Sequence, residues 1–186
     1  MAPVRAIRPR VGYADLERMP EDGRRYELYD GEICVVPAPI PLHQRVVREL
    51  EHSLYLYASQ HGGEVLASPL DIVFAEYDVL QPDVVFFQAS RRHLIEPHRA
   101  IRSAPDLAIE VLSPSTLERD RVTKMQMYAR YGVKEYWLVD PLAHRVEVYW
   151  LSGGGYVLAH TASEADTVQS TLFADLKIPA ASLFVD

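Results

Sequence analysis

The chain has 186 residues, of which 48% are hydrophobic and 24% charged, and its formal net charge is −7. This length and composition fit one folded domain and exclude a mostly disordered chain. The negative charge argues against a protein that coats nucleic acid by bulk electrostatic attraction, although carboxylates that hold cations would add to the acidic count. The single cysteine, Cys34, excludes an internal disulfide and fits a reducing compartment.

Residues 1–10 contain three arginines but lack the apolar stretch of a signal peptide. No segment approaches the roughly 20 apolar residues that a membrane span needs. We therefore expect a cytoplasmic protein without membrane contact. We place a lead-in over residues 1–25 and a single domain over residues 26–186.

Patterns in the first half of the chain predict one long helix among short elements. The helix is the clearest of them, because Val46, Leu50 and Leu54 recur at helical spacing and the pair Gly62-Gly63 ends it. Short strands bounded by turn residues accompany it. The expected elements are a weak helix over 13–18, strands over 32–36, 64–66 and 70–74, and the long helix over 42–60.

Two nearly continuous apolar runs in the second half predict strands that are buried on both faces. They are residues 83–87 (DVVFF) and 106–112 (DLAIEVL). A helix over 115–132 follows, with Ser115 and Glu118 as a capping box and Gly132 at its end. A strand over 135–140 comes next, so this order allows a crossover between parallel strands.

The C-terminal part is rich in predicted strands. They cover 145–151, 156–161 and 167–172, with a hairpin turn at the three glycines 153–155 and a final helical turn over 179–184. Two long helices among six or more strands make an α/β or α+β domain with a β-rich C-terminal part.

Two carboxylates stand inside the apolar runs. Asp83 begins the first run, and alternation places Glu110 on one face of the second with Ala108 and Leu112. A carboxylate in such a strand costs several kcal/mol unless it is paired, hydrogen-bonded or bound to metal. Asp83 alone is explained as well by a solvent-wetted strand end, and a buried partner such as an arginine would be an alternative explanation for Glu110.

Lys124 lies on the helix that follows Glu110. Asp120, Lys124 and Tyr128 are spaced i, i+4, i+8 and form one polar stripe. One interpretation is an exposed Asp–Lys pair that contributes a few tenths of a kcal/mol. The other is that the stripe faces the carboxylates, and spacing alone does not choose between them.

These residue types suit hydrolysis of a phosphodiester. Two or three carboxylates hold a hard divalent cation such as Mg²⁺ through oxygen ligands. The cation polarises the phosphoryl oxygen and lowers the pKa of a bound water, while a lysine orients that water or offsets charge in the transition state.

A basic cluster falls within residues 91–102 and contains four arginines and two histidines. We favour a solvated connection, which is the ordinary role of a charge-rich loop. A rim that contacts phosphates is the functional alternative.

Several segments resemble a known family. The sequence is similar to the Uma-two family of restriction-endonuclease-like proteins, in the PD-(D/E)XK nuclease superfamily. The block over 105–141 is the specific part of the resemblance, which runs over most of the chain. The segments are 26–31 (YELYDG), His43, 81–83 (QPD), 105–116 (PDLAIEVLSPST), Asp120, Lys124, Tyr128 and 132–141 (GVKEYWLVDP).

The resemblance implies a mixed sheet flanked by helices and a metal site. Asp83 and Glu110 would be the two metal-binding acids, and Glu27 would support the metal site, although Glu27 could equally be a structural carboxylate beside Arg24 or Arg25. The superfamily's simplest pattern places the lysine two residues after the second acid, where this chain has Leu112. The resemblance puts the lysine at Lys124 instead, and His43 is given no chemistry.

We therefore expect an endonuclease that depends on Mg²⁺ or Mn²⁺ and hydrolyses nucleic acid, with DNA as the favoured substrate. Asp83, Glu110 and Lys124 would be catalytic, with water activated by the carboxylate-bound cation and Lys124. The alternative is a catalytically inactive nuclease-fold module that binds nucleic acid or protein. We expect a homodimer, and a third interpretation is a scaffold whose copies join through the β-rich tail.

Overall fold

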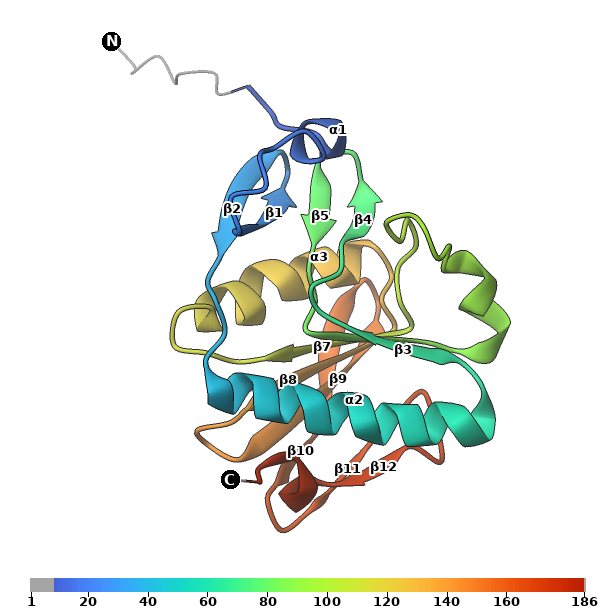
Figure 1. Ribbon diagram of the computed structural model, residues 1–186. Helices are drawn as coiled ribbons and strands as arrows, with labels where there is room; N and C mark the ends of the chain where they lie inside the picture. The colour runs from blue at the N-terminus through green and yellow to red at the C-terminus, as the bar shows by residue number, and fades with distance from the viewer. Residues whose placement is uncertain (1–8, 186) are drawn as a thin grey trace.

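The main sheet of the domain is mixed and has six strands in the order β10-β9-β8-β7-β6-β3 (Figure 1). The computed structural model describes residues 9–185. Only β7 and β8 pair in parallel, and every other neighbouring pair in this sheet is antiparallel. The strands are β3 (Glu64–Ala67), β6 (Val84–Phe87), β7 (Leu107–Val111), β8 (Glu135–Asp140), β9 (Arg145–Ser152) and β10 (Gly155–Ser163).

A second, four-stranded sheet in the order β2-β1-β5-β4 stands above the main sheet in Figure 1. Its strands are β1 (Arg25–Tyr29), β2 (Glu32–Val36), β4 (Ile72–Ala75) and β5 (Asp78–Leu80). The short helix α1 (Tyr13–Leu16) packs beside it, because Tyr13 joins Leu28, Val73 and Val79 in one buried cluster.

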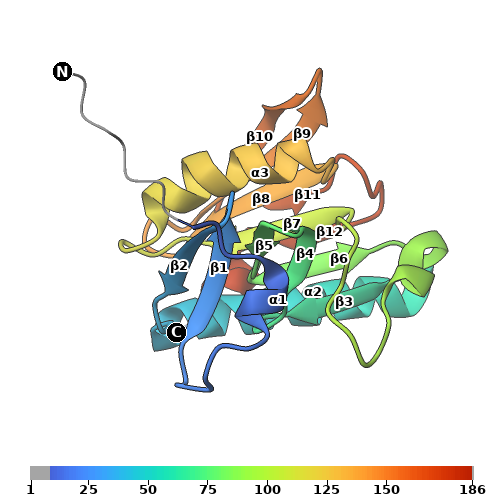
Figure 2. The same cartoon turned by 90° about the horizontal axis from the view of Figure 1, so that it is seen from above.

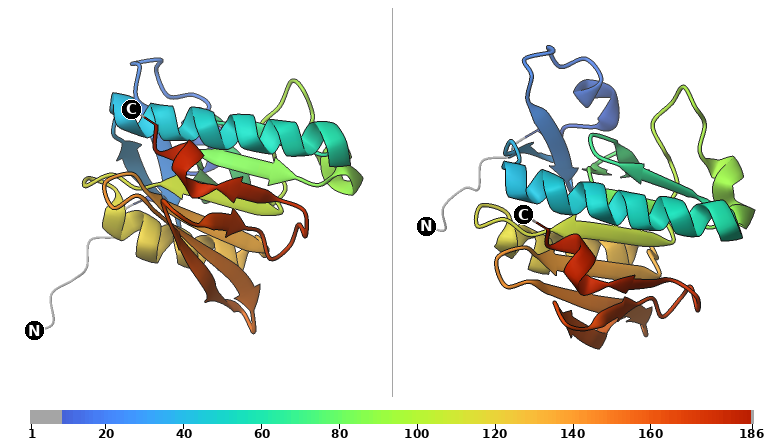
Figure 3. Two further views of the ribbon diagram at one scale, coloured as in Figure 1. Left: turned by 90° about the horizontal axis from the view of Figure 1, so that it is seen from below. Right: turned by 60° about the horizontal axis from the view of Figure 1, so that its bottom comes forward.

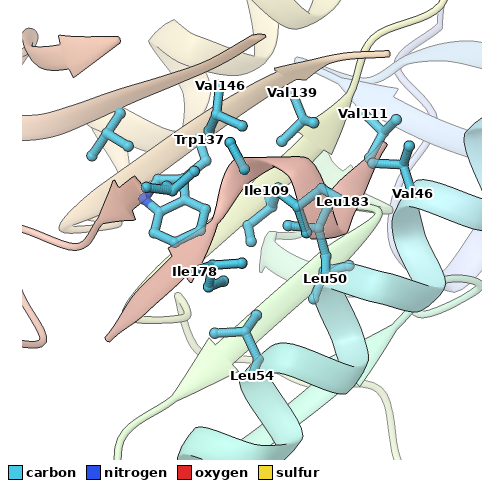
Figure 4. Close-up of a cluster of buried hydrophobic side chains, with 14 of the residues drawn as sticks. Val46, Leu50, Leu54, Ile109, Val111, Trp137, Val139, Val146, Ile178 and Leu183 are labelled. Atoms are coloured by element: carbon cyan, nitrogen blue, oxygen red, sulfur yellow. The ribbon is translucent and has the colours of Figure 1, made fainter. Parts of the chain in front are cut away.

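Helix α2 (Pro41–His61) covers one face of the main sheet. A proline suits its first turn, where the backbone N–H has no helical partner, and Gly62 at φ +76° ends it. Its buried residues, among them Leu50 and Leu54, pack on Ile109 and Trp137 of the central strands (Figure 4). Full burial of each leucine contributes about 1.5–3 kcal/mol, so this layer fixes α2 on the sheet.

A second helical segment covers the opposite face, and Figure 2 shows α3 and α2 on opposite sides of the sheet. It consists of the π-helical turn η2 (Arg119–Lys124) followed by α3 (Met125–Arg130). Tyr128 packs there against Ala108, Tyr136 and Leu138. The main sheet is therefore the middle of three layers.

The prediction of a continuous α-helix over 115–132 was wrong in its interior and at its start. The helical segment spans 117–130, and six of its residues form the π-helical turn. The capping box does not form among the described residues, because the Ser115 hydroxyl lies 3.0 Å from the Ser113 hydroxyl instead. A serine that satisfies a neighbouring side chain is not available to cap the helix.

The C-terminal segment packs beside α2 on the same side of the sheet (Figure 3). It contains β11 (Thr167–Gln169), β12 (Lys177–Pro179) and the 3₁₀ turn η3 (Ala180–Leu183). The buried Glu135 of β8 holds this segment, since its carboxylate accepts hydrogen bonds from Thr171, Leu172 and Trp137.

Most predicted elements are confirmed. The strands over 32–36 and 135–140 have the predicted bounds, α2 extends its prediction by one residue at each end, and the parallel crossover from β7 to β8 is present. The hairpin turn at Gly153-Gly154 joins β9 and β10, and both glycines have positive φ. The first eight residues of the expected lead-in lie outside the described part. Over residues 9–185, no helix combines the length and the apolar character that crossing a bilayer demands.

Candidate active site

A pocket of about 180 Å³ lies where β7 ends. Three loops gather at this edge of the sheet, on the left in Figure 1: the β2–α2 connection, the turn after β7, and the β8–β9 turn. The carboxyl ends of parallel strands are the usual place for a ligand in α/β sheets. The pocket lining includes Arg25, Pro37, His43, Gln81, Asp83, Glu110, Ser113, Asp120 and Lys124.

Glu110 and Lys124 form a buried pair at the base of this pocket. The Lys124 ammonium donates to Glu110 Oε2 over 2.9 Å, and the Tyr128 hydroxyl donates to Oε1 over 2.6 Å. Glu110 is 2% exposed and Lys124 is 4% exposed. The polar stripe therefore faces the carboxylates, and the interpretation of an exposed Asp–Lys pair was wrong.

Glu27 lies on the other side of Lys124. Its Oε1 is 3.2 Å from the ammonium and accepts the Gln81 backbone N–H over 2.8 Å, while Tyr29 donates to Oε2 over 2.6 Å. Arg119 approaches Oε2 at 3.9 Å. Both oxygens of this fully buried carboxylate are thus engaged.

Arg24 and Arg25, the two arginines named as partners for Glu27, contact other groups. Arg24 pairs with Asp22, and Arg25 donates to the Pro37 carbonyl. Glu110 does have a buried partner, as the alternative interpretation required, but among the described residues that partner is Lys124 and not an arginine.

Asp83 immediately precedes β6 and is held from two directions. Its Oδ2 accepts the backbone N–H of Val111 over 2.8 Å and lies 3.1 Å from His43 Nε2. The bond to Val111 ties the start of β6 to the end of β7, and His43 comes from the first turn of α2. Asp83 is 8% exposed, so it is a fixed carboxylate in the pocket wall and not a solvated strand end.

Asp120 is a fourth buried acid at this site. Its Oδ1 lies 3.7 Å from the Lys124 ammonium, and the side chain lines the pocket. Its backbone is fixed too, because Tyr136 donates to the Asp120 carbonyl over 3.0 Å. Among the described residues, Oδ1 is a buried oxygen without a hydrogen-bond partner.

The electrostatics follow from four buried acids around the pocket, of which Glu27, Glu110 and Asp120 pair with one lysine. Burial raises the pKa of Glu110 well above its usual range; Lys124 opposes this, and the nearby Asp83, Asp120 and Glu27 add to it. Burial also raises the pKa of Asp120, again against the effect of Lys124. Burial alone would lower the pKa of Lys124, but the Glu110 and Glu27 carboxylates raise it above its usual range, so Lys124 is an ammonium.

The acidic side chains at the pocket show how far this site fits the expected metal ion. Within residues 9–185, no three His, Cys, Asp or Glu side chains are arranged as a ready metal-binding group. The expected set of Asp83, Glu110 and Glu27 therefore does not form one, because Lys124 lies against both glutamates. Mg²⁺ is usually held by one or two carboxylates together with waters and substrate phosphates. Asp83 and Glu110, with the unpartnered oxygen of Asp120 beside them, fit that simpler requirement.

The basic cluster over 91–102 lies at the other end of the strands. β6 runs away from the pocket and β7 runs toward it, so residues that follow Phe87 stand beside Asp106 and not beside Val111. Arg91 pairs there with Asp106, and Arg92 pairs with Glu64. This placement favours the solvated-connection interpretation over a phosphate rim at the pocket.

Sequence reasoning missed several residues that hold the site. Tyr29 and Gln81 orient Glu27, and His43 contacts Asp83. His43 and Gln81 stood in the resembling segments, but neither had a local signal for its contact. Asp120 was recognised as part of the polar stripe and was given no role.

A mixed sheet with helices on both faces and a buried acid–lysine cluster at the end of its parallel strand pair defines a nuclease-like domain. The chain belongs to the Uma2 family, whose model carries the description "Putative restriction endonuclease" and matches residues 13–181. The expected family and fold class are confirmed.

One solved structure with this fold is described as a "putative nuclease belonging to DUF820" from Anabaena variabilis ATCC 29413. It is 22% identical to this chain, with a TM-score of 0.76 over 94% of this chain and 97% of the other. At this level of identity the likeness establishes the fold. No match was found among curated proteins.

Proposed function

We propose that this chain is an endonuclease that depends on a divalent cation, Mg²⁺ or Mn²⁺, and hydrolyses phosphodiester bonds in DNA. The observation that carries the proposal is the excess of buried negative charge around one pocket. Glu27, Asp83, Glu110 and Asp120 are each at most 8% exposed, and among the described residues the only lysine paired with any of them is Lys124, which contacts all but Asp83. Buried charge of this kind is costly unless a cation offsets it.

Asp83 and Glu110 would hold the cation. Both hydrogen bonds to Asp83 go to Oδ2, which leaves Oδ1 of this pocket-lining residue without a hydrogen bond among the described residues. Each Glu110 oxygen accepts one hydrogen bond and retains a second lone pair. A bound divalent cation supplies Lewis-acid polarisation of the phosphoryl group and acidification of water.

Lys124 would act by its charge. Its ammonium is fixed by Glu110 and Glu27, so it needs no reorganisation to stabilise negative charge that develops on a phosphoryl oxygen. Glu27 would support the site through this lysine, and Tyr128 would hold Glu110 in place. Arg25, at the pocket wall, is a candidate contact for a neighbouring phosphate.

DNA is proposed as the substrate because the family description names a restriction endonuclease. The direct test is incubation of purified protein with supercoiled plasmid in Mg²⁺, in Mn²⁺ and in chelator. We expect nicking or linearisation that needs the cation, and loss of about 10²-fold or more in rate for Glu110→Gln and Lys124→Met. Glu164→Gln, at an exposed pair with His144, is the matched control.

Absence of cleavage in every cation, with single- and double-stranded DNA and with RNA, would refute the proposal. Cleavage that survives both substitutions would also refute it, because the activity would then come from another site or from a contaminant.

A catalytically inactive module is the second candidate. It is favoured by the complete pairing of Glu110, whose two oxygens already accept hydrogen bonds from Lys124 and Tyr128. This candidate predicts no heat of Mg²⁺ or Mn²⁺ binding in calorimetry and a more stable Glu110→Gln protein, because one buried charge is removed. The endonuclease proposal predicts instead that Mg²⁺ or Mn²⁺ binding gives a measurable heat.

We also propose a homodimer that works in the cytoplasm. The exposed Trp150, Val157 and Leu158 on the β9–β10 hairpin support a dimer through this β-rich part, and the single thiol of Cys34 supports a reducing compartment. Sedimentation of the wild type and of Trp150→Glu measures the dimer. A monomeric wild type would refute it.

A further inference from the structure

Lys124 is poorly placed to take a proton from water. Its ammonium donates to Glu110 and is paired with Glu27 and Asp120 at 3.2 and 3.7 Å. A group held as a cation by three carboxylates stabilises charge but does not accept a proton. If the site hydrolyses a phosphodiester, another group must accept the proton that the attacking water loses.

Three of the four acids are already engaged. Both oxygens of Glu110 and both oxygens of Glu27 accept hydrogen bonds. Asp83 accepts two on Oδ2 and is the proposed cation ligand. Glu27 and Glu110 have no oxygen that is free of a hydrogen bond, and the free Oδ1 of Asp83 is assigned to the cation.

Asp120 combines burial with a free acceptor oxygen. The side chain is 2% exposed and lines the pocket, and its Oδ1 is buried with no hydrogen-bond partner in the part of the chain described. The π-helical turn and the hydrogen bond from the Tyr136 hydroxyl to the Asp120 carbonyl fix the backbone of Asp120. Turns of this kind occur often at functional sites.

We infer that Asp120 is a catalytic residue that holds the attacking water and accepts its proton. This inference rests on the proposed function and names the proton acceptor of that same site. In the step, the water oxygen forms a bond to phosphorus, the bond from phosphorus to the leaving oxygen breaks, and the water proton passes to Asp120 Oδ1. The leaving alkoxide takes a proton from solvent, so charge and atoms balance.

The groups that face Asp120 come from several elements. Lys124 shares its helical segment, Thr116 precedes it, Glu27 lies on β1, and Asp83 stands at the start of β6. Burial raises the pKa of Asp120, Lys124 and Thr116 oppose this, and the Asp83 and Glu27 carboxylates add to it. A positioned carboxylate of this kind is a residue type that serves as a general base.

The test compares Asp120→Asn with the wild type in single-turnover cleavage of a labelled DNA that the wild type cuts. Asparagine keeps the shape but does not accept the proton, so we expect the cleavage rate to fall about 10²–10⁴-fold. DNA affinity and the heat of Mn²⁺ binding should be unchanged, and Asp120→Glu should recover part of the rate. Asp175→Asn, at an exposed carboxylate, is the matched control.

Each outcome decides the inference. Suppose that the wild type and Asp175→Asn cut the DNA and that Asp120→Asn cuts it at the same rate. Asp120 is then not the proton acceptor, although the proposed function stands. If Asp120→Asn loses Mn²⁺ binding together with cleavage, it is a cation ligand and the inference is overturned. If the wild type cuts no nucleic acid, the proposed function and this inference fail together. A folded Asp120→Asn is verified by its thermal transition.

Discussion

Lys124 and Glu110 form a buried ion pair although they belong to different secondary-structure elements, with the ammonium nitrogen 2.9 Å from Oε2. The chain leaves the sheet after β7, turns at the pocket edge and returns across the same face as a helical segment, which carries Lys124 over Glu110. Because both side chains are less than 5% exposed, water screens neither charge. Removal of one partner therefore leaves a buried charge without compensation.

Lys124→Met tests this dependence. The substitution keeps the length and the apolar stem of the side chain but leaves the surrounding carboxylates without their cation. We expect the free energy of unfolding to fall by about 3–5 kcal/mol, the usual cost of breaking a buried pair. Urea denaturation at pH 7.5, in chelator, measures it.

The control for this experiment is Lys177→Met, at an exposed position of β12. Its free energy of unfolding should change by no more than about 0.5 kcal/mol. A Lys124→Met protein as stable as this control would mean that the surrounding acids become protonated at no cost in stability. The ion-pair account would then be wrong.

A second prediction concerns the stability of the whole domain in the presence of cation. A ligand that binds only the folded state stabilises it by about 2.7 kcal/mol at 100 times its dissociation constant. We expect Mg²⁺ or Mn²⁺ to raise the Tm of the wild type and to leave the Tm of Asp83→Asn unchanged. Differential scanning fluorimetry with a cation titration measures both.

The matched control is Asp175→Asn, whose Tm should rise with cation as the wild type does. Ca²⁺, a second hard cation with oxygen ligands, tests whether the site distinguishes ions by size. Equal shifts in wild type and Asp83→Asn would place the bound cation elsewhere on the protein.

A third prediction concerns pH and the turn that carries Asp120 and Lys124. Burial acts to raise the pKa of Glu147, but hydrogen bonds from Arg121 and Tyr149 outweigh it and hold that pKa below its usual value of 4.5. Arg121 donates to both Glu147 oxygens, at 2.7 and 3.1 Å, and so ties the π-helical turn to β9.

A depressed folded-state pKa contributes stability that is present above the unfolded value, near pH 4.5, and is lost as pH falls through the folded value. We therefore expect the wild type to exceed Glu147→Gln in unfolding free energy by about 1.5–3 kcal/mol at pH 7. The difference should shrink below pH 4.5. Urea titrations of both proteins from pH 3 to pH 7 measure it, and a constant difference across that range would contradict the prediction.

The sequence predicted the strands of the main sheet well because their signals are local, whereas β1, β5 and β12 were missed. The apolar runs around Asp83 and Glu110 predicted that these strands are buried. Alternation of side chains along the second strand placed Glu110 with Ala108 on the face that meets the returning helix. The i, i+4 spacing then made Lys124 a candidate partner for Glu110. What spacing could not supply was the rotation of that helix, which depends on the packing of Tyr128 against Tyr136.

The remaining contacts of the site join residues that are distant in sequence. Glu27 meets Lys124 because β1 belongs to a separate small sheet that packs over the pocket. No local sequence pattern predicts how that sheet packs on the rest of the domain. His43 meets Asp83 for a similar reason, since the start of α2 is placed by its whole apolar face. The π-helical turn gave no signal either, because its residues are ordinary helix formers.

A last prediction concerns Glu135, a buried acid far from the pocket that resembles the site acids in burial alone. Its carboxylate accepts hydrogen bonds from the Trp137 indole and from the backbone N–H groups of Thr171 and Leu172. No lysine or arginine pairs with Glu135 among the described residues, so hydrogen bonds alone satisfy it. It therefore joins the C-terminal segment to β8 and has no catalytic part.

Glu135→Ala should lower the free energy of unfolding by at least about 3 kcal/mol, since each hydrogen bond to a charged group contributes about 1.5–3 kcal/mol. Hydrogen exchange of residues 167–185 should accelerate more than that of α2, because the lost bonds hold that segment locally. Glu51→Ala, at an exposed position of α2, is the control. Equal acceleration throughout the domain would show that Glu135 supports the whole core and not the C-terminal segment in particular.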